Sequence, residues 1–180
     1  MIYQPSEDSY LLASIISKYV KNKSVLDVGA GSGILAETAK KSGAKSVLAV
    51  DINSNAIKLL KQKNIPAIKS NLFSKIKKNK KFDFIFCNPP YLPEDKREDK
   101  KSQKITTGGK KGDEFILKFI KQAENYLNKN GKILLLLSSF TPRNKIISLI
   151  NKSNLNYKII ISKNLFFETL EVWEVKYNNA

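Results

Sequence analysis

The fold of the chain is decided by residues 24–33, which read Ser24-Val25-Leu26-Asp27-Val28-Gly29-Ala30-Gly31-Ser32-Gly33. An apolar run of this kind is typical of a strand that is buried in a parallel sheet. The glycines that follow permit positive φ angles and let the backbone approach a ligand closely. We expect a helix over residues 34–42, ended by Gly43. These residues therefore predict one strand-turn-helix unit.

The same design recurs directly after this unit. Residues 46–51 form a second apolar strand that closes on an acid, and residues 54–63 form the next helix. Five further strands are expected at 66–70, 82–87, 133–137, 155–161 and 168–175. Pro66 lacks an N–H donor, so the strand that it opens suits the edge of a sheet.

Three more helices are predicted by apolar side chains at helical spacing. Ser6 caps the first, with acids in its first turn and an apolar face over residues 10–20. Asp113 caps the second, whose inner face extends to Leu127, and Pro142 opens the third.

Strands that alternate with helices and end in a strand pair predict an α/β protein. The expected architecture is a doubly wound sheet with an antiparallel element at its end. No repeat, linker or change of composition divides residues 1–180, so we expect a single domain. A chain of this length can bury roughly 70% of the surface that its unfolded form exposes.

Several function classes are excluded by composition. No run approaches the roughly 20 apolar residues of a membrane-spanning helix, and the N-terminus lacks the pattern of a secretory signal. We therefore expect a soluble, cytoplasmic protein without a membrane partner. Cys87 is the only cysteine and the chain has no histidine, so a disulfide, a Cys-rich zinc site and a histidine base are excluded. We expect no metal site.

The formal net charge is +16, and it is carried almost entirely by lysine. Such a charge would attract RNA, DNA or an acidic protein, but it could equally reflect a compositional drift toward lysine. Two lysine-rich segments, from Lys75 to Lys81 and from Lys96 to Lys111, are expected to flank the mouth of the site. They would steer a partner there, or form solvated loops without a specific role.

The glycines at positions 29, 31 and 33 alternate, whereas a dinucleotide-binding loop follows Gly-x-Gly-x-x-Gly/Ala. The loop therefore resembles the S-adenosylmethionine loop of class I methyltransferases. The resemblance implies a Rossmann-like fold with a seven-stranded, mostly parallel sheet and an antiparallel terminal strand. It also implies S-adenosyl-L-methionine as the cofactor, bound by Asp27, Gly29 and Gly31, with Asp27 facing its amino acid end.

Two further positions would complete the cofactor site. Asp51 ends the second strand, so its carboxylate would point into the crevice and accept both hydrogens of a ribose diol, or else cap the next helix. Asn71 and Leu72 stand at the end of the third strand, where this class holds the adenine ring. Aspartate is usual there, so asparagine must use its carbonyl oxygen as the acceptor.

Asn88-Pro89-Pro90-Tyr91 looks like the signature of methyltransferases that alkylate planar nitrogens. These are the amide of glutamine and the exocyclic amines of adenine and cytosine. Their lone pair is delocalised, so two acceptors must hold the hydrogens and turn the lone pair toward the methyl group. Asn88 Oδ1, beside the cofactor, and the Pro89 carbonyl would be those acceptors. Pro90 would stiffen the backbone, and Tyr91 would pack on the flat substrate group.

The opening Tyr3-Gln4-Pro5-Ser6-Glu7-Asp8-Ser9 resembles that of the short, HemK-like methyltransferases of archaea and eukaryotes. That family methylates the glutamine of the Gly-Gly-Gln loop in peptide chain release factors. The resemblance implies that Ser9 lies near the cofactor. It also implies a second partner, a small zinc-binding activator that pairs with the sheet edge in the segment from Ile65 to Ser70.

The sequence thus favours a methyltransferase that acts on a protein glutamine amide. An adenine amino methyltransferase acting on RNA or DNA is the alternative, which the charge favours and the N-terminal opening disfavours. A protein lysine methyltransferase and a cofactor-binding scaffold without turnover are less favoured interpretations.

Overall fold

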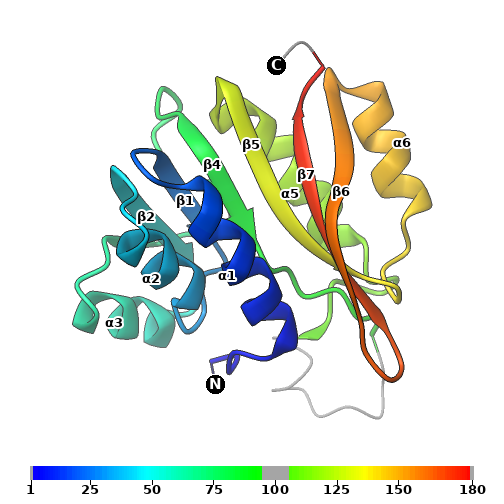
Figure 1. Ribbon diagram of the computed structural model, residues 1–180, viewed down its shortest axis with the longest axis horizontal. Helices are drawn as coiled ribbons and strands as arrows, with labels where there is room; N and C mark the ends of the chain where they lie inside the picture. The colour runs from blue at the N-terminus through cyan, green and yellow to red at the C-terminus, as the bar shows by residue number, and fades with distance from the viewer. Residues whose placement is uncertain (1, 95–105, 179–180) are drawn as a thin grey trace.

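The computed structural model describes residues 2–94 and 106–178. They form a seven-stranded sheet with the order β3-β2-β1-β4-β5-β7-β6 (Figure 1). Its strands are β1 (Ser24–Val28), β2 (Ser46–Asp51), β3 (Ala67–Lys69), β4 (Phe82–Cys87), β5 (Leu127–Ser138), β6 (Leu155–Asn164) and β7 (Thr169–Tyr177). β7 is antiparallel to β5 and β6, whereas the other adjacent pairs are parallel. The predicted α/β fold, with seven mostly parallel strands and β3 at an edge, is confirmed.

The sheet reverses its strand order between β1 and β4, which are neighbours although β2 and β3 separate them in the chain. Asp27 of β1 lies beside Phe86 of β4 in the parallel ladder. Gly29 and Asn88, each two residues further on, therefore leave the sheet side by side. In open α/β sheets, ligands bind at such a switch point.

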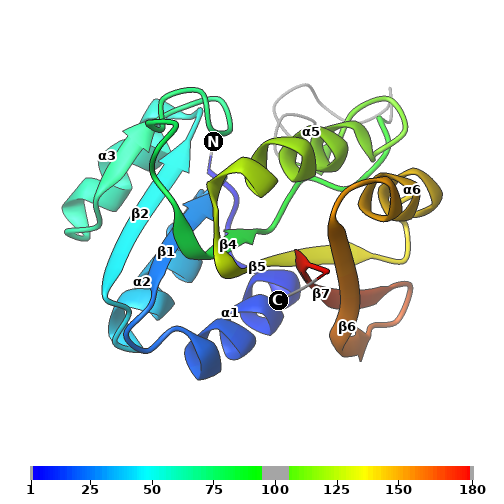
Figure 2. The ribbon, with the colours of Figure 1, turned by 90° about the horizontal axis from the view of Figure 1, so that it is seen from above.

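Helices cover both faces of the sheet (Figure 2). One face carries α1 (Glu7–Tyr19), α2 (Ile34–Lys41) and α3 (Ser54–Gln62). The other carries α5 (Glu114–Ala123) and α6 (Asn144–Lys152). The chain therefore forms three layers, with the sheet between two layers of helices.

Each face of the sheet has its own hydrophobic cluster. Val25 and Phe86 pack with α1, α2 and α3, whereas Leu26 and Ile85 pack with α5 and α6. This alternation follows from the two-residue period of a strand, and it explains why β1 and β4 are apolar on both faces. Each such buried side chain contributes about 1.5–3 kcal/mol to folding.

The region after α5 differs from the sequence prediction. Helix α5 ends at Ala123, one 3-10 turn, η1 (Glu124–Tyr126), follows, and β5 begins at Leu127 instead of at residue 133. The prediction that Leu127 lies on the inner face of a helix is therefore wrong. Leu127 pairs with Phe82 at the start of β4, and the ladder is irregular just beyond this pair. Strand pairing thus overrides the turn propensity of residues 128–131.

The two terminal strands are longer than predicted and form a hairpin. β6 continues to Asn164, and β7 runs from Thr169 to Tyr177. The tip of the hairpin lies at the same end of the molecule as the carboxyl end of β4 (Figure 1). In the described part of the chain, no helix combines the length and the apolar character that a bilayer crossing requires.

Candidate active site

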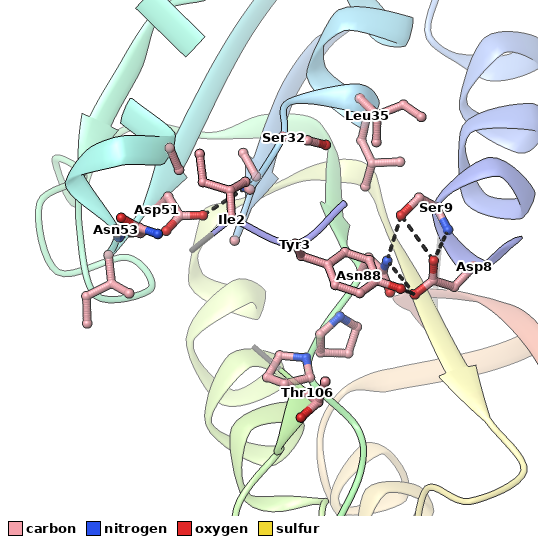
Figure 3. A pocket seen from close by; sticks show the side chains of 18 of the residues that line it. Ile2, Tyr3, Asp8, Ser9, Ser32, Leu35, Asp51, Asn53, Asn88 and Thr106 are labelled. Carbon is pink, nitrogen blue, oxygen red and sulfur yellow. Dashed lines mark hydrogen bonds between the residues drawn. The ribbon is translucent and has the colours of Figure 1, made fainter. Parts of the chain in front are cut away.

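A cavity of about 670 Å³ lies where β1, β2 and β4 end. Its volume falls within the range of about 300–1,000 Å³ that small-molecule sites occupy. Figure 3 shows side chains from the N-terminal segment, the glycine loop and the segments after β2 and β4 converging on it. The lining includes Tyr3, Asp8, Ser9, Phe115 and residues 29–32, 51–53 and 88–92.

The glycine loop forms one wall of the cavity. Gly29, Gly31 and Gly33 have φ angles of 74°, 52° and 83°, which side chains disfavour. A Cβ at Gly33 would lie 2.6 Å from Leu60 Cδ2, so this glycine serves the packing of the loop on α3. A Cβ at Gly29 would have no neighbour within 4 Å. The space above Gly29 is therefore open to a ligand, and the loop fits a cofactor that the backbone must approach closely.

Asp51 is bound to this loop and also lines the cavity. Its Oδ2 accepts a hydrogen bond from the Gly31 N–H at 2.8 Å, and its Oδ1 accepts one from the Asn53 N–H at 2.7 Å. Each carboxylate oxygen has a second lone pair, so Asp51 can still accept from a ligand hydroxyl pair. The structure thus fits the predicted ribose contact, while the cap of α3 is made by the side chain of Asn53.

Asp27 lies behind the loop and does not line the cavity. It is 1% exposed, its Oδ2 accepts a hydrogen bond from the Ala36 N–H at 3.0 Å, and its Oδ1 has no partner in the described part of the chain. Burial, reinforced by the charge of Asp51, raises the pKa of Asp27 to about 7. Asp27 therefore ties β1 to the start of α2 and leaves one buried acceptor beneath the loop.

Asn71 and Leu72 are not part of this cavity. They line a second one, of about 470 Å³, together with residues 107–109 and α5. Phe115 borders both cavities, so the two cavities are neighbours. The structure therefore does not bring the expected adenine-binding residues together with the glycine loop in a single cavity.

The four residues after β4 line the cavity, as the sequence predicts. Asn88 Nδ2 donates hydrogen bonds to Asp8 Oδ2 at 3.1 Å and to Ser9 Oγ at 3.3 Å. Asn88 Oδ1 is buried and has no partner among residues 2–94 and 106–178. A buried acceptor without a donor is costly, so this oxygen is suited to an incoming N–H.

Tyr91 lies half-buried in the same wall as Asn88. Burial, followed by the charges of Asp8 and Glu168, raises the pKa of its hydroxyl far above the ordinary value. A tyrosine hydroxyl is already neutral at physiological pH, and this shift makes its ionisation still less favourable, so Tyr91 can pack on a flat group or donate a hydrogen bond.

The backbone after Tyr91 is held by a returning segment. The Leu92 N–H donates to the Thr106 carbonyl at 3.0 Å, and the Gly108 N–H donates to the Leu92 carbonyl at 2.9 Å. A Cβ at Gly108 would lie 2.6 Å from the Pro90 carbonyl oxygen. Only glycine therefore allows this close approach, which fixes the position of Pro90.

The two lysine-rich segments differ in their relation to the cavities: residues 106–109 of the second segment line the cavity walls, whereas the first segment does not. Residues 75–81 line neither cavity, and Lys81 directly precedes β4, at the opposite end of this strand from Asn88. Most of the second segment, residues 96–105, lies outside the described residues.

Sequence reasoning missed one central residue and several wall residues. The sequence marks Asp8 only as an acid in the first turn of a helix and as part of the family-like opening, yet its carboxylate holds Asn88. Its position directly before Ser9 is the available signal. Ile52 and Asn53 carry no motif, so only the fold places them in the cavity wall.

The fold and the site define a class I methyltransferase. The model of the methyltransferase small domain family matches residues 6–167. A relative from Methanocaldococcus jannaschii, named as a candidate protein N5-glutamine methyltransferase, is 40% identical over 91% of this chain and 85% of its own. A release factor glutamine methyltransferase from Fusobacterium nucleatum is 38% identical over 46% of this chain, and the match covers 26% of that longer protein.

One solved structure has the same fold over nearly its whole length. The E. cuniculi Mtq2–Trm112 complex, described as responsible for the methylation of the termination factor eRF1, gives a TM-score of 0.80 at 22% identity. The alignment covers 98% of this chain and 99% of that one.

The chain belongs to the methyltransferase small domain family and is a methyltransferase related to the protein N5-glutamine methyltransferases. The resemblance to the short HemK-like enzymes is confirmed.

We expect Asp27→Asn to change how stability depends on pH. The pKa of Asp27 rises from 3.8 when unfolded to about 7 when folded, so the folded state keeps a proton that the unfolded state releases. The contribution of protonated Asp27 to the free energy of unfolding is fully present below about pH 4 and is lost as the pH rises through about 7. Between pH ~5 and ~8, the thermal midpoint of the wild type should fall about 5 °C more than that of the variant. Parallel midpoint curves in circular dichroism would contradict the assignment.

We expect Gly108→Ala to impair methyl transfer without impairing cofactor binding. The new Cβ would collide with the Gly112 carbonyl oxygen and lie 2.6 Å from that of Pro90, so it would displace the backbone around Pro90, whereas the glycine loop and Asp51 lie elsewhere in the wall. The turnover number should fall about 10-fold to 100-fold. Calorimetry should show cofactor affinity within a few-fold of wild type. Unchanged turnover would show that the position of Pro90 does not matter.

Proposed function

We propose that this chain transfers a methyl group from S-adenosyl-L-methionine to the side-chain amide nitrogen of a glutamine. The proposed substrate is the Gly-Gly-Gln loop of a peptide chain release factor, a protein of translation termination, so the proposed place of the reaction is the cytoplasm. The observation that carries this proposal is the Asn88 amide, whose Nδ2 is held by Asp8 and Ser9 while Oδ1 lacks a donor within the described residues. The names of two relatives and the role described for the Mtq2–Trm112 complex support the same substrate.

The residues of the larger cavity fit the cofactor. Gly29 and Gly31 leave room for backbone approach, and Asp51 offers free lone pairs to a ribose diol. Ser9 lines the same cavity on the side of Asn88, so both would lie beside the transferred methyl group. Asn71 and Leu72 would contribute only through the neighbouring cavity beyond Phe115.

Asn88 and Pro89 would activate the amide by orientation. The Asn88 Oδ1 and the Pro89 carbonyl accept the two hydrogens of the substrate nitrogen, and this fixes the direction of its lone pair. When bound, the cofactor supplies an electrophilic methyl group: the nitrogen lone pair forms the new N–C bond, the C–S bonding pair stays on sulfur, and one nitrogen proton leaves to water. Positioning of this kind can supply about 7–11 kcal/mol of the barrier.

The alternative acceptor is the adenine amine of RNA or DNA, and the net charge of +16 is the observation that favours it. Tyr91 is not the only aromatic residue to consider. The tip of the β6–β7 hairpin carries Phe166 and Phe167, which are 93% and 81% exposed. Single-stranded nucleic acid binding combines ring faces with cations that contact phosphate. These two rings meet edge to face at 85° and are followed by Glu168, with no cation among residues 165–168. The tip therefore suits a protein surface better than a nucleic acid.

The second proposed partner is a small zinc-binding activator at the outer edge of β3. This strand is the first in the sheet order, so one side of its backbone has no strand partner in the described sheet. Ile68 on β3 and Ile52 after β2 are 36% and 65% exposed, which gives this edge apolar side chains. An exposed strand edge with apolar neighbours is a surface for strand addition.

Asn88→Ala should abolish methyl transfer to a release factor and leave cofactor affinity within a few-fold of wild type. The reason is that the amide acts on the nucleophile and not on the cofactor. Transfer would be measured with labelled cofactor and affinity by calorimetry. Loss of cofactor binding in the variant would show that the role of Asn88 is misassigned.

A choice of acceptors tests the substrate directly. The chain is mixed with labelled cofactor and a release factor, the same factor with its Gly-Gly-Gln glutamine replaced by alanine, or structured RNA. Label should appear only on the unaltered factor. Label on the RNA would favour the adenine alternative, and label on the altered factor would exclude its loop as the target.

Ile68→Lys should weaken binding of the zinc-binding activator at least about 10-fold, because a charge at the centre of β3 opposes strand addition. The matched control is Ile159→Lys on β6, the strand at the opposite edge, where the isoleucine is 45% exposed. Binding would be measured with the purified activator protein. Equal losses in both variants would place the activator elsewhere.

A further inference from the structure

Asp8 lies in the first turn of α1 and connects it to the segment after β4 (Figure 3). It is 4% exposed, and both of its oxygens are used. Oδ2 accepts hydrogen bonds from the Tyr3 hydroxyl at 2.8 Å and from Asn88 Nδ2 at 3.1 Å. Oδ1 accepts from the backbone N–H and the hydroxyl of Ser9. This buried carboxylate is therefore fully hydrogen-bonded, with Asn88 as its most distant partner in sequence.

The chemistry of a carboxylate decides which end of the Asn88 amide faces it. An ionised carboxylate can only accept hydrogen bonds, whereas the two ends of an asparagine amide are similar in shape but opposite in character. Asn88 must therefore turn its NH₂ toward Asp8, which leaves Oδ1 as the end without a partner in the described part of the chain. With the amide reversed, the Asn88 NH₂ would face the substrate nitrogen, and one of the two substrate hydrogens would lose its acceptor, leaving only the Pro89 carbonyl.

We infer that Asp8 is a positioning residue that fixes the Asn88 side chain as an acceptor and thereby makes the site select a nitrogen that carries hydrogens. The inference rests on the proposed function, because it concerns the acceptor at the same site. It holds for a glutamine amide and for an exocyclic amine alike, since both donate from NH₂.

The negative charge of Asp8 has a second effect. A donated N–H that points at a carboxylate polarises the whole amide and makes its carbonyl oxygen a stronger acceptor. The substrate nitrogen becomes more positive as the new N–C bond forms, so this strengthening grows along the reaction. The same charge, after burial, contributes to the raised pKa of the Tyr91 hydroxyl.

A reciprocal exchange of the two side chains tests the inference. In Asn88→Asp, two carboxylates would face each other at hydrogen-bond distance. In Asp8→Asn, the negative charge would be lost, and nothing would then force the NH₂ end of the Asn88 amide to face position 8. In the double variant, the asparagine introduced at position 8 donates to the carboxylate introduced at position 88, which still offers an oxygen to the substrate.

We expect the turnover number to fall about 100-fold in Asn88→Asp and about 10-fold in Asp8→Asn, and to recover at least about 10-fold in the double variant relative to Asn88→Asp. If Asp8 and Asn88 had only separate structural roles, the losses of turnover in the two single variants would multiply in the double variant. Multiplying losses would therefore overturn the inference.

The matched control is Glu7→Gln, which removes the same charge from the neighbouring position. Glu7 is exposed and pairs with Lys163, away from Asn88. Its activity should stay within about two-fold of wild type. An effect as large as that of Asp8→Asn would show that charge in the first turn of α1, and not the contact with Asn88, matters.

Two readouts do not depend on turnover. With S-adenosylhomocysteine present, calorimetry should show weaker binding of a Gly-Gly-Gln peptide to Asp8→Asn, with unchanged S-adenosylhomocysteine affinity. In the wild-type protein, the side-chain NH₂ of Asn88 should exchange its hydrogens with solvent slowly in NMR spectra, because both Asp8 and Ser9 accept from it. Fast exchange would overturn the inference even where a variant fails to fold.

The proposed function can fail separately from this inference. If the wild type methylates RNA and not the release factor, the proposed substrate is wrong, and the same exchange is then measured on the RNA. Recovery in the double variant on either acceptor supports the role of Asp8.

Discussion

The site depends on the parallel pairing of β1 with β4. These strands are far apart in the chain, yet Asp27 lies beside Phe86, and the two segments that follow leave the sheet together. One segment supplies the glycine loop and the other supplies Asn88, so the pairing would bring the cofactor and the nucleophile to one place. The apolar residues that bury both faces of these strands therefore stabilise the geometry of the site as well as the fold.

A chain without histidine can still be an enzyme because this reaction needs orientation more than proton transfer. Asn88 and Pro89 offer carbonyl oxygens, and Tyr91 is a neutral, partly buried side chain. Gly108 lets its own backbone approach the Pro90 carbonyl closely. The carboxylates nearby are used to hold other groups: Asp51 holds the glycine loop, and Asp8 holds Asn88. The carboxylate charges of the site thus act mainly by holding the glycine loop and Asn88 in position.

The sequence is sufficient for the features that local patterns encode. Apolar runs, alternating glycines and the proline pair locate the strands, the loop and the segment after β4 with boundaries close to those observed. The sequence is insufficient where contacts between residues far apart in the chain determine a strand boundary, a hydrogen bond or a cavity wall. The start of β5 depends on pairing with β4, the bond between Asp8 and Asn88 joins residues 80 apart, and the wall that contains Asn71 depends on how α5 packs. Asp8 in particular looks like an ordinary first-turn acid until the fold brings Asn88 to it.

The role of Asn88 as the acceptor for a glutamine amide is tested most directly by a crystal structure of the chain with S-adenosylhomocysteine and a Gly-Gly-Gln peptide. We predict that the glutamine side-chain nitrogen lies within hydrogen-bond distance of both Asn88 Oδ1 and the Pro89 carbonyl, with the cofactor sulfur on its far side and the Asn88 NH₂ still on Asp8. A glutamine side chain bound away from Asn88, or an Asn88 amide turned with its oxygen toward Asp8, would contradict this role.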